Sequence, residues 1–182
     1  MKFQPLPLQG AWLIEAEPIT DERGFFTRII DRQQFQSYGL NSDLLQASMS
    51  HNTHRGTLRG MHLQVTPFAE TKLIRVTSGS ILDVIIDLRK NSSTYLEHFA
   101  VTLRASEPAI LYVPEGFAHG FQTLADHTEV YYHMNQVYHG PSARSFLWSD
   151  LQFGIEWPFP TPILSPKDAS APVFDPQQLS AI

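Results

Sequence analysis

The sequence predicts an all-β sandwich or barrel. Short runs rich in Val, Ile, Leu, Phe and Tyr recur along the chain, and turn residues such as Asp21-Glu22-Arg23-Gly24 and Pro114-Glu115-Gly116 separate them. Short strands at this spacing are typical of antiparallel sandwiches and barrels. The predicted strands are 11–16, 25–30, 57–64, 71–77, 80–88, 96–103, 109–113, 120–124 and 129–138.

A few short helices and an irregular tail complete the expected fold. Asp31 can cap a helix with Phe35 and Tyr38 on one side, and Gly39 ends it. Residues 158–182 hold six of the 13 prolines. Proline cannot donate a hydrogen bond to a strand ladder, so this tail is expected to be irregular with short turns.

The composition narrows the classes of function. A chain of 182 residues fits one domain, 1–182. The net charge of −5 and the absence of a basic stripe argue against a nucleic-acid partner. No targeting segment or membrane span is visible, which makes the cytoplasm the expected location. The chain has no cysteine, so His, Asp, Glu, Lys or Tyr must carry any chemistry.

The strand 57–64 contains the first candidate site residue. Residues alternate between the two faces of a strand, which predicts that Leu58, Gly60, His62 and Gln64 share one face. A glycine within a strand often lets a ligand approach the backbone. His62 is therefore either a site residue or a histidine satisfied by a backbone carbonyl.

A second motif, Pro114-x-Gly116-x-x-His119, resembles the second conserved motif of the cupin superfamily. Metal-binding cupins have a His-x-His pair and a glutamate in the first motif, where this chain has His62-Leu63-Gln64 and then Glu70. A metal held by His62, Glu70 and His119 would suit non-haem iron. Glutamine is a poor substitute for imidazole, which weakens this interpretation.

Three further features have both a structural and a functional interpretation. Lys72 and Asp83 interrupt apolar strands, either as a buried ion pair or with the lysine as a cation beside a developing oxyanion. Tyr132 and Tyr138 fall on one face of a strand, as core residues or as a proton donor near the lysine. Residues 163–168 predict a turn or helix start with a solvated charge pair.

Taken together, the motifs resemble the dTDP-4-dehydrorhamnose 3,5-epimerase family of the cupin superfamily. The resemblance rests on D-E-R-G-F-F at 21–26, R-G-M-H-L-Q at 59–64, D-V-I-I-D-L-R at 83–89, P-E-G-F-A-H-G-F at 114–121 and L-S-P-K-D at 164–168. It implies a cupin jelly roll, a homodimer that exchanges an N-terminal strand, and an isomerase without metal or other cofactor. The implied substrate is a nucleotide-diphospho-4-keto-6-deoxy sugar in deoxysugar biosynthesis.

The resemblance also implies roles for individual residues. His62 would be the general base with Asp168 orienting its imidazole, Tyr132 the general acid on the opposite face, and Lys72 a cation near the C4 oxygen. These groups suit an enolate mechanism, which needs a base, an acid and a cation. The implied substrate-binding residues are Arg59, Arg23 and Lys167 at the diphosphate, His119 at the sugar or adjacent phosphate, Phe26 and Tyr138 at the base, and Gln46.

Departures from the family leave the nucleotide open. Arg28 stands where the family usually has a glutamate that helps to recognise thymine, and Ala143 stands near a second such position. The same catalytic residues would serve epimerisation at carbon 3, at carbon 5 or at both. Two other classes remain: a metal-dependent cupin oxygenase or isomerase, and a cupin that binds a sugar nucleotide without catalysis.

Overall fold

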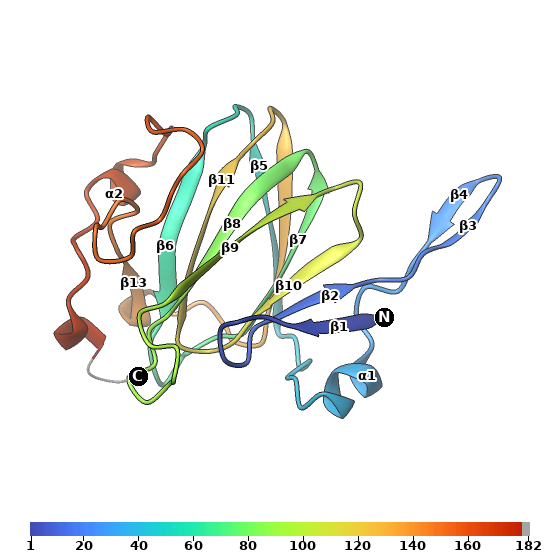
Figure 1. The fold of residues 1–182 in the computed structure, drawn as a ribbon, viewed down its shortest axis with the longest axis horizontal. Helices are drawn as coiled ribbons and strands as arrows, with labels where there is room; N and C mark the ends of the chain where they lie inside the picture. Colours follow the sequence, from blue (N-terminus) through green and yellow to red (C-terminus); the bar gives the residue numbers. More distant parts are fainter. Residues whose placement is uncertain (180–182) are drawn as a thin grey trace.

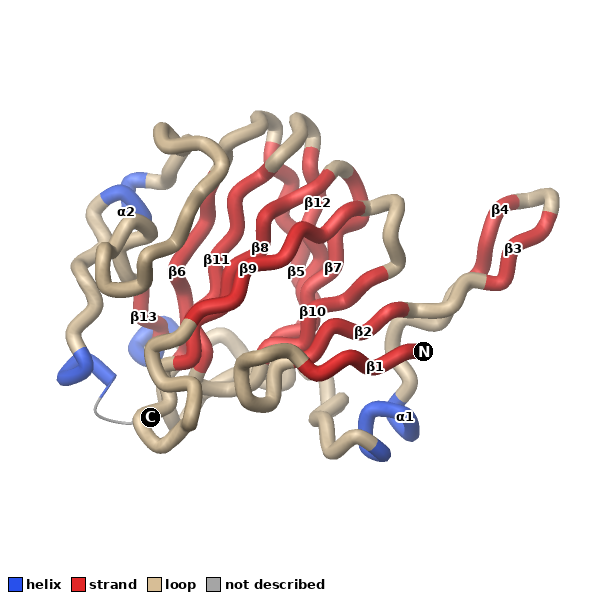
Figure 2. Tube along the Cα trace, viewed as in Figure 1, coloured by secondary structure: helices blue, strands red, loops and turns tan. Residues whose placement is uncertain are grey.

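Two antiparallel β-sheets face each other in the computed structural model, which describes residues 1–179 (Figures 1 and 2). The first sheet has the order β1 (Lys2–Pro5), β2 (Trp12–Glu15), β10 (Ala109–Val113), β7 (Lys72–Ser78), β12 (Thr128–Met134) and β5 (Gln46–Asn52). The second has the order β13 (Ala143–Ser145), β6 (Leu58–Gln64), β11 (Phe117–Thr123), β8 (Ser80–Asp87) and β9 (His98–Arg104). The all-β prediction is confirmed.

Alternation along the central strands builds the core between the sheets and a second apolar layer outside. In β8, Ile81 and Ile85 join the cluster between the sheets, whereas Val84 and Ile86 join a cluster on the outer face. A strand buried on both faces is expected to be apolar almost throughout. Asp83 shares the inner face with Ile81 and Ile85, which places a carboxylate inside the sandwich.

Short helices and the tail cover the outer faces. Helix α1 (Arg32–Ser37) begins after Asp31, whose side chain accepts hydrogen bonds from two backbone N–H groups, and Phe35 is buried against the first sheet. Gly39 follows with a φ of 71°, a left-handed conformation that favours glycine. The predicted helix is confirmed. The tail, with α2 (Pro166–Ala169) and the 3₁₀ helix η2 (Pro176–Leu179), packs on the second sheet.

A hairpin of β3 (Ile19–Asp21) and β4 (Gly24–Phe26) projects away from both sheets, and we call residues 19–26 the arm (Figure 1). The predicted strand 25–30 is wrong in extent, because the chain leaves the hairpin after Phe26 and turns toward α1. The predicted strand 129–138 ends at Met134, and the 3₁₀ helix η1 (Gly140–Ser142) follows.

Four short or polar strands, β1, β3, β5 and β13, carry no strong apolar signal and were not predicted. Within residues 1–179, no helix is long and apolar enough to cross a membrane. The expected domain 1–182 includes residues 180–182, which lie outside the described residues, and its boundaries stay a prediction.

Candidate active site

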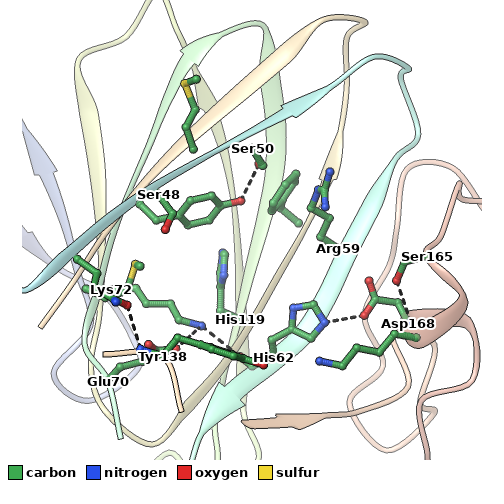
Figure 3. A pocket seen from close by; sticks show the side chains of 16 residues that line it. Ser48, Ser50, Arg59, His62, Glu70, Lys72, His119, Tyr138, Ser165 and Asp168 are labelled. Atoms are coloured by element: carbon green, nitrogen blue, oxygen red, sulfur yellow. Dashed lines mark hydrogen bonds and ion pairs between the residues drawn. The ribbon is translucent and has the colours of Figure 1, made fainter. Parts of the chain in front are cut away.

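A cavity of about 480 Å³ opens between the two sheets (Figure 3). This volume is typical of small-molecule sites. Strands β5, β7 and β12 form one wall, β6 and β11 form the other, and the start of α2 lies at the edge. The lining includes every residue expected in the site except Arg23 and Phe26: Gln46, Arg59, His62, Lys72, His119, Tyr132, Tyr138, Lys167 and Asp168.

An irregularity in β6 brings Arg59 and His62 to the same face. His119 of β11 pairs with His62, but Phe121 pairs with Arg59, so β6 has one more residue than β11 in this stretch. Gly60 adopts a φ of 138°, and a Cβ there would lie 2.5 Å from the Cα of Gly120. Strict alternation, which grouped residues 58, 60, 62 and 64, therefore fails at Gly60.

His62 and Asp168 form a close pair at the edge of the cavity. The Nε2 atom of His62 lies 2.6 Å from a carboxylate oxygen of Asp168 (Figure 3). Ser165 caps α2 by accepting the backbone N–H of Asp168, which fixes that residue at the helix start. The helix start is as predicted, but Asp168 is buried, so the expected solvated charge pair is wrong.

Hydrogen bonds keep Asp168 ionised. Burial alone would raise the pKa of Asp168, but hydrogen bonds from His62, Ser165 and the backbone of Gly60, together with the charge of His62, outweigh it and lower that pKa. An ionised carboxylate can only accept hydrogen bonds. Nε2 of His62 must therefore carry the proton, which leaves Nδ1 as the ring nitrogen able to act as a base.

Tyr132 extends from the opposite sheet. Its ring lies 6.4 Å from the ring of His119 and 6.5 Å from that of Phe121, between centroids, and its hydroxyl is 3.1 Å from the hydroxyl of Ser50. Burial raises the pKa of Tyr132 above its ordinary value, more than the bond to Ser50 lowers it. The phenol is therefore held in its protonated form, which is the form that can donate a proton.

Lys72 and Glu70 form an ion pair at the other end of the cavity. The Nζ atom of Lys72 is 3.2 Å from Glu70, and both side chains are largely buried. The alternative of a Lys72–Asp83 ion pair is wrong, because Asp83 is within 2.9 Å of Nε2 of His119 instead. Lys72 lines the cavity, and its Nζ atom also lies 3.5 Å from the backbone carbonyl oxygen of His62.

The side chains considered for a metal are occupied by protein partners. Gln64 donates to two backbone carbonyls and to Glu70, and it accepts the backbone N–H of His139. In residues 1–179, no three His, Asp or Glu side chains are grouped so that they could hold a metal ion. His62, Glu70 and His119 therefore do not form the ligand set that the metal interpretation requires.

Arg23 and Phe26 lie on the arm, away from the cavity of their own chain, and line a separate hollow there. Both side chains are exposed. Of the two departures from the family, Arg28 pairs with Asp31 at the start of α1, and Ala143 lies in β13 opposite Gln64. Neither departure lines the cavity of its own chain.

The sequence reasoning missed several lining residues. Half of them come from β5, whose sequence Gln-Ala-Ser-Met-Ser-His-Asn lacks an apolar inner face because that face lines the cavity. The alternation of Gln46, Ser48 and Ser50 was an available signal. The missed lining residues are Ser48, Met49, Ser50, Phe121, Met134 and Ser165.

Comparison with known proteins identifies the family. The model of the dTDP-4-dehydrorhamnose 3,5-epimerase family matches residues 5–176. The dTDP-4-dehydrorhamnose 3,5-epimerase of Shigella flexneri is 39% identical over 163 residues, which are 89% of this chain and 90% of that protein. The structure of the Bacillus anthracis enzyme with TDP and PPi bound has a TM-score of 0.92 at 39% identity, over 95% of this chain and 99% of that one.

A second solved structure is more distant. A 3′-monoepimerase from Streptomyces bikiniensis, in complex with dTDP-quinovose, has a TM-score of 0.87 at 30% identity, over 93% of this chain and 86% of that one. Fold and site thus define an isomerase with a cupin-like jelly roll. The chain belongs to the dTDP-4-dehydrorhamnose 3,5-epimerase family, which confirms the resemblance drawn from its sequence.

Proposed function

We propose that the protein epimerises a nucleotide-diphospho-4-keto-6-deoxy sugar next to its ketone, through an enolate formed by His62 and protonated by Tyr132. One observation carries the proposal: the His62 imidazole, paired with Asp168, and the Tyr132 phenol extend from opposite sheets into one cavity. Inversion of a carbon needs a base on one side and an acid on the other, and this cavity supplies both. The substrate follows from the family.

The reaction begins with removal of a proton. Nδ1 of His62 takes the hydrogen from the carbon beside the C4 ketone, and the electron pair moves to the C4 oxygen. Asp168 holds the imidazole and stabilises the imidazolium that forms, as in other carboxylate–histidine pairs. The ammonium of Lys72 stabilises the enolate oxygen, an effect of about 3–4 kcal/mol for one well-placed donor.

Protonation from the other side completes the inversion. The Tyr132 hydroxyl donates its proton to the opposite face of the same carbon, and the C4 carbonyl forms again. The proton taken by His62 passes to solvent, and the phenolate regains a proton from solvent, so the reaction is balanced without a redox partner. Arg59 and Lys167 at the cavity edge suit an anionic diphosphate.

A homodimer would complete the nucleotide side of the site. The arm exposes Ile19, Phe25 and Phe26 at its surface, whereas β1 is already paired with β2 of its own chain. We propose that the arm is the N-terminal segment exchanged between protomers and that it brings Arg23 and Phe26 to the partner's site. A deletion of residues 19–26 that leaves the dimer intact, measured by light scattering, would contradict this.

Hydrogen exchange in deuterated water tests the proposed reaction. NMR of the substrate should show deuterium entering at carbon 3, carbon 5 or both, and the pattern decides between a double epimerase and a monoepimerase like the S. bikiniensis relative. Tyr132→Phe should bind with unchanged affinity and lose turnover. Binding without any exchange in the unaltered protein would instead favour a non-catalytic cupin.

The identity of the nucleotide is a separate question. A thermal-shift series with dTDP, UDP, GDP and CDP ranks the bases, because a ligand stabilises a protein in proportion to the logarithm of its concentration over its Kd. We expect dTDP to give the largest shift, from the family. A larger shift with another base would point to Arg28 as the altered contact. The cytoplasmic location stays a prediction.

A further inference from the structure

The inward face of β5 carries a row of polar side chains, of which Asn52 is buried to 2% exposure. A buried amide costs free energy unless its donors and acceptor are bonded. The Asn52 amide both donates and accepts a hydrogen bond. Its Nδ2 atom donates to the backbone carbonyl of Thr128 at 3.0 Å, and its Oδ1 atom accepts from Nε of Arg59 at 2.7 Å.

These two contacts permit only one orientation of the Asn52 amide. A carbonyl can only accept and a guanidinium can only donate, so the amide nitrogen must face Thr128 and the amide oxygen must face Arg59. Asn52 thereby links the guanidinium to the backbone of β12. Arg59 lines the cavity, and within residues 1–179 its two terminal nitrogens have no protein hydrogen-bond partner.

Ser50, two residues earlier on the same face, makes the corresponding contact with Tyr132. Its hydroxyl is the hydrogen-bond partner of the Tyr132 phenol, at 3.1 Å (Figure 3). The remaining neighbours of the phenol ring include Phe121 and His119, whose rings lie edge-on or tilted to it. Nδ2 of Asn52 lies 3.5 Å from the Ser50 hydroxyl, so the two contacts adjoin.

We propose that Ser50 and Asn52 are positioning residues with separate tasks: Asn52 aims Arg59 at the anionic group of the substrate, and Ser50 aims the Tyr132 hydroxyl at the reacting carbon. This inference rests on the proposed function and adds to it the residues that hold its acid and its anion-binding group. Substitutions at these two residues of β5 should therefore change different kinetic parameters, KM for Asn52 and kcat for Ser50.

Steady-state kinetics separate the two tasks. Asn52→Ala should raise KM about tenfold with little change in kcat, the effect of one charge-assisted hydrogen bond. Ser50→Ala should lower kcat about tenfold with KM changed less than about twofold, because its contact matters when the proton is delivered. His51→Ala is the matched control, since His51 lies between them on the other face and pairs with Glu129.

Deuterium exchange gives a readout that a purely structural role would not change. When Tyr132 is misaligned, the enolate formed by His62 is protonated again on its original side by deuterium from the solvent. Ser50→Ala should therefore raise the ratio of deuterium in recovered substrate to inverted product. Ser50→Thr, which keeps the hydroxyl, should restore the ratio, and Asn52→Ala should leave it unchanged.

A double-mutant cycle tests the Arg59 contact even if Asn52→Ala folds poorly. Lysine cannot bond to Asn52 and also present a forked pair of donors, so Arg59→Lys should raise KM on its own. Asn52→Ser, which shortens the side chain, should then raise KM in the natural chain but not in the Arg59→Lys chain. Additive effects would overturn the role of Asn52.

The outcomes are distinguishable from a failure of the proposed function. If the unaltered protein shows neither turnover nor exchange, the proposed function is wrong and the inference fails with it. If the unaltered protein is active but Ser50→Ala and Asn52→Ala change kcat and KM alike, or match the His51→Ala control, then only the positioning roles are wrong.

Discussion

Two histidine–aspartate pairs each contribute an imidazole to the cavity lining, and they differ in exposure. The His62 side chain is 37% exposed and its partner Asp168 only 5%, whereas His119 and Asp83 are exposed by 6% and 0%. His62 and His119 are direct neighbours across β6 and β11. The same two residue types, side by side, therefore occupy very different electrostatic environments.

The two carboxylates respond in opposite directions. Burial raises the pKa of Asp83 despite the charge and hydrogen bond of His119, while hydrogen bonds lower the pKa of Asp168 despite its burial. One pair consists of an accessible imidazole on a firmly ionised carboxylate, which suits a base. The other is enclosed, which suits shaping and binding. Residue type alone therefore does not assign a role to either pair.

The largest expected effect is at the accessible pair. His62→Ala should lower kcat by about 10²–10⁴-fold, the usual contribution of a general base, and should abolish deuterium exchange at the reacting carbons. His119→Ala serves as the comparison and should retain exchange, since His119 is proposed to bind and not to abstract. Exchange that survives in His62→Ala and is lost in His119→Ala would reverse the two assignments.

Asp168→Asn should have a smaller but still large effect. The amide can donate to Nε2, which favours the imidazole tautomer with its proton on Nδ1 and removes the free base. We expect kcat to fall by about 10²-fold or more, in line with the loss of a carboxylate that orients a catalytic histidine. Single-turnover kinetics would check this. A change confined to KM would mean that Asp168 contributes only to binding.

Lys72→Met should rank third, with kcat lowered by about 10²-fold because the enolate oxygen loses its cation. Glu70→Gln is the matched variant. It keeps the shape and removes the charge that pairs with Lys72 at 3.2 Å. If Lys72 stabilises the enolate, removal of that competing anion should not lower kcat. Equal losses of kcat in both variants would show that the intact ion pair, and not the lysine alone, is required.

Much of the candidate site could be predicted from the sequence, because several of its residues lie in local sequence patterns. Lys72 was expected to interrupt an apolar strand, and it lines the cavity while Ile74 and Val76 of the same strand join the core between the sheets. The motif Pro114-x-Gly116-x-x-His119 identified His119 as a candidate, and this residue lies in β11 and lines the cavity. The family resemblance then supplied His62, Tyr132 and Asp168, although they come from three distant segments.

The parts that could not be predicted depend on tertiary contacts. The extra residue in β6 is visible only in the pairing with β11, and it decides that Arg59 and His62 share a face. Asp83 was the expected ion-pair partner of Lys72, and only the tertiary structure shows that Glu70 takes that place. Strand β5 gave no apolar signal because its inner face is bordered by a polar cavity.

The smallest predicted effect concerns stability and has opposite signs at the two aspartates. The folded-state pKa of Asp168 is lowered, so its carboxylate stabilises the fold above the unfolded-state pKa of about 3.9, and this contribution is lost as the pH falls through the folded value. Asp168→Asn should therefore lower the free energy of unfolding at pH 7 and approach the unaltered protein in acid.

For Asp83 the folded-state pKa is raised, so its contribution to stability is complete below the unfolded-state pKa and is lost as the pH rises through the folded value. From pH 4 upward, the free energy of unfolding of Asp83→Asn should therefore rise relative to that of the unaltered protein, by at most about 1.4 kcal/mol per pH unit. Urea unfolding of the three proteins between pH 2 and 8 measures both differences, with the Asp168 difference changing below about pH 4 and the Asp83 difference above it. In a His119→Asn background, the gain from Asp83→Asn should become larger, because the imidazole no longer offsets the burial of the carboxylate. If the stability differences of Asp168→Asn and Asp83→Asn changed with pH in the same direction, the predicted electrostatic difference between the two pairs would be wrong. The pairs would then differ only in exposure.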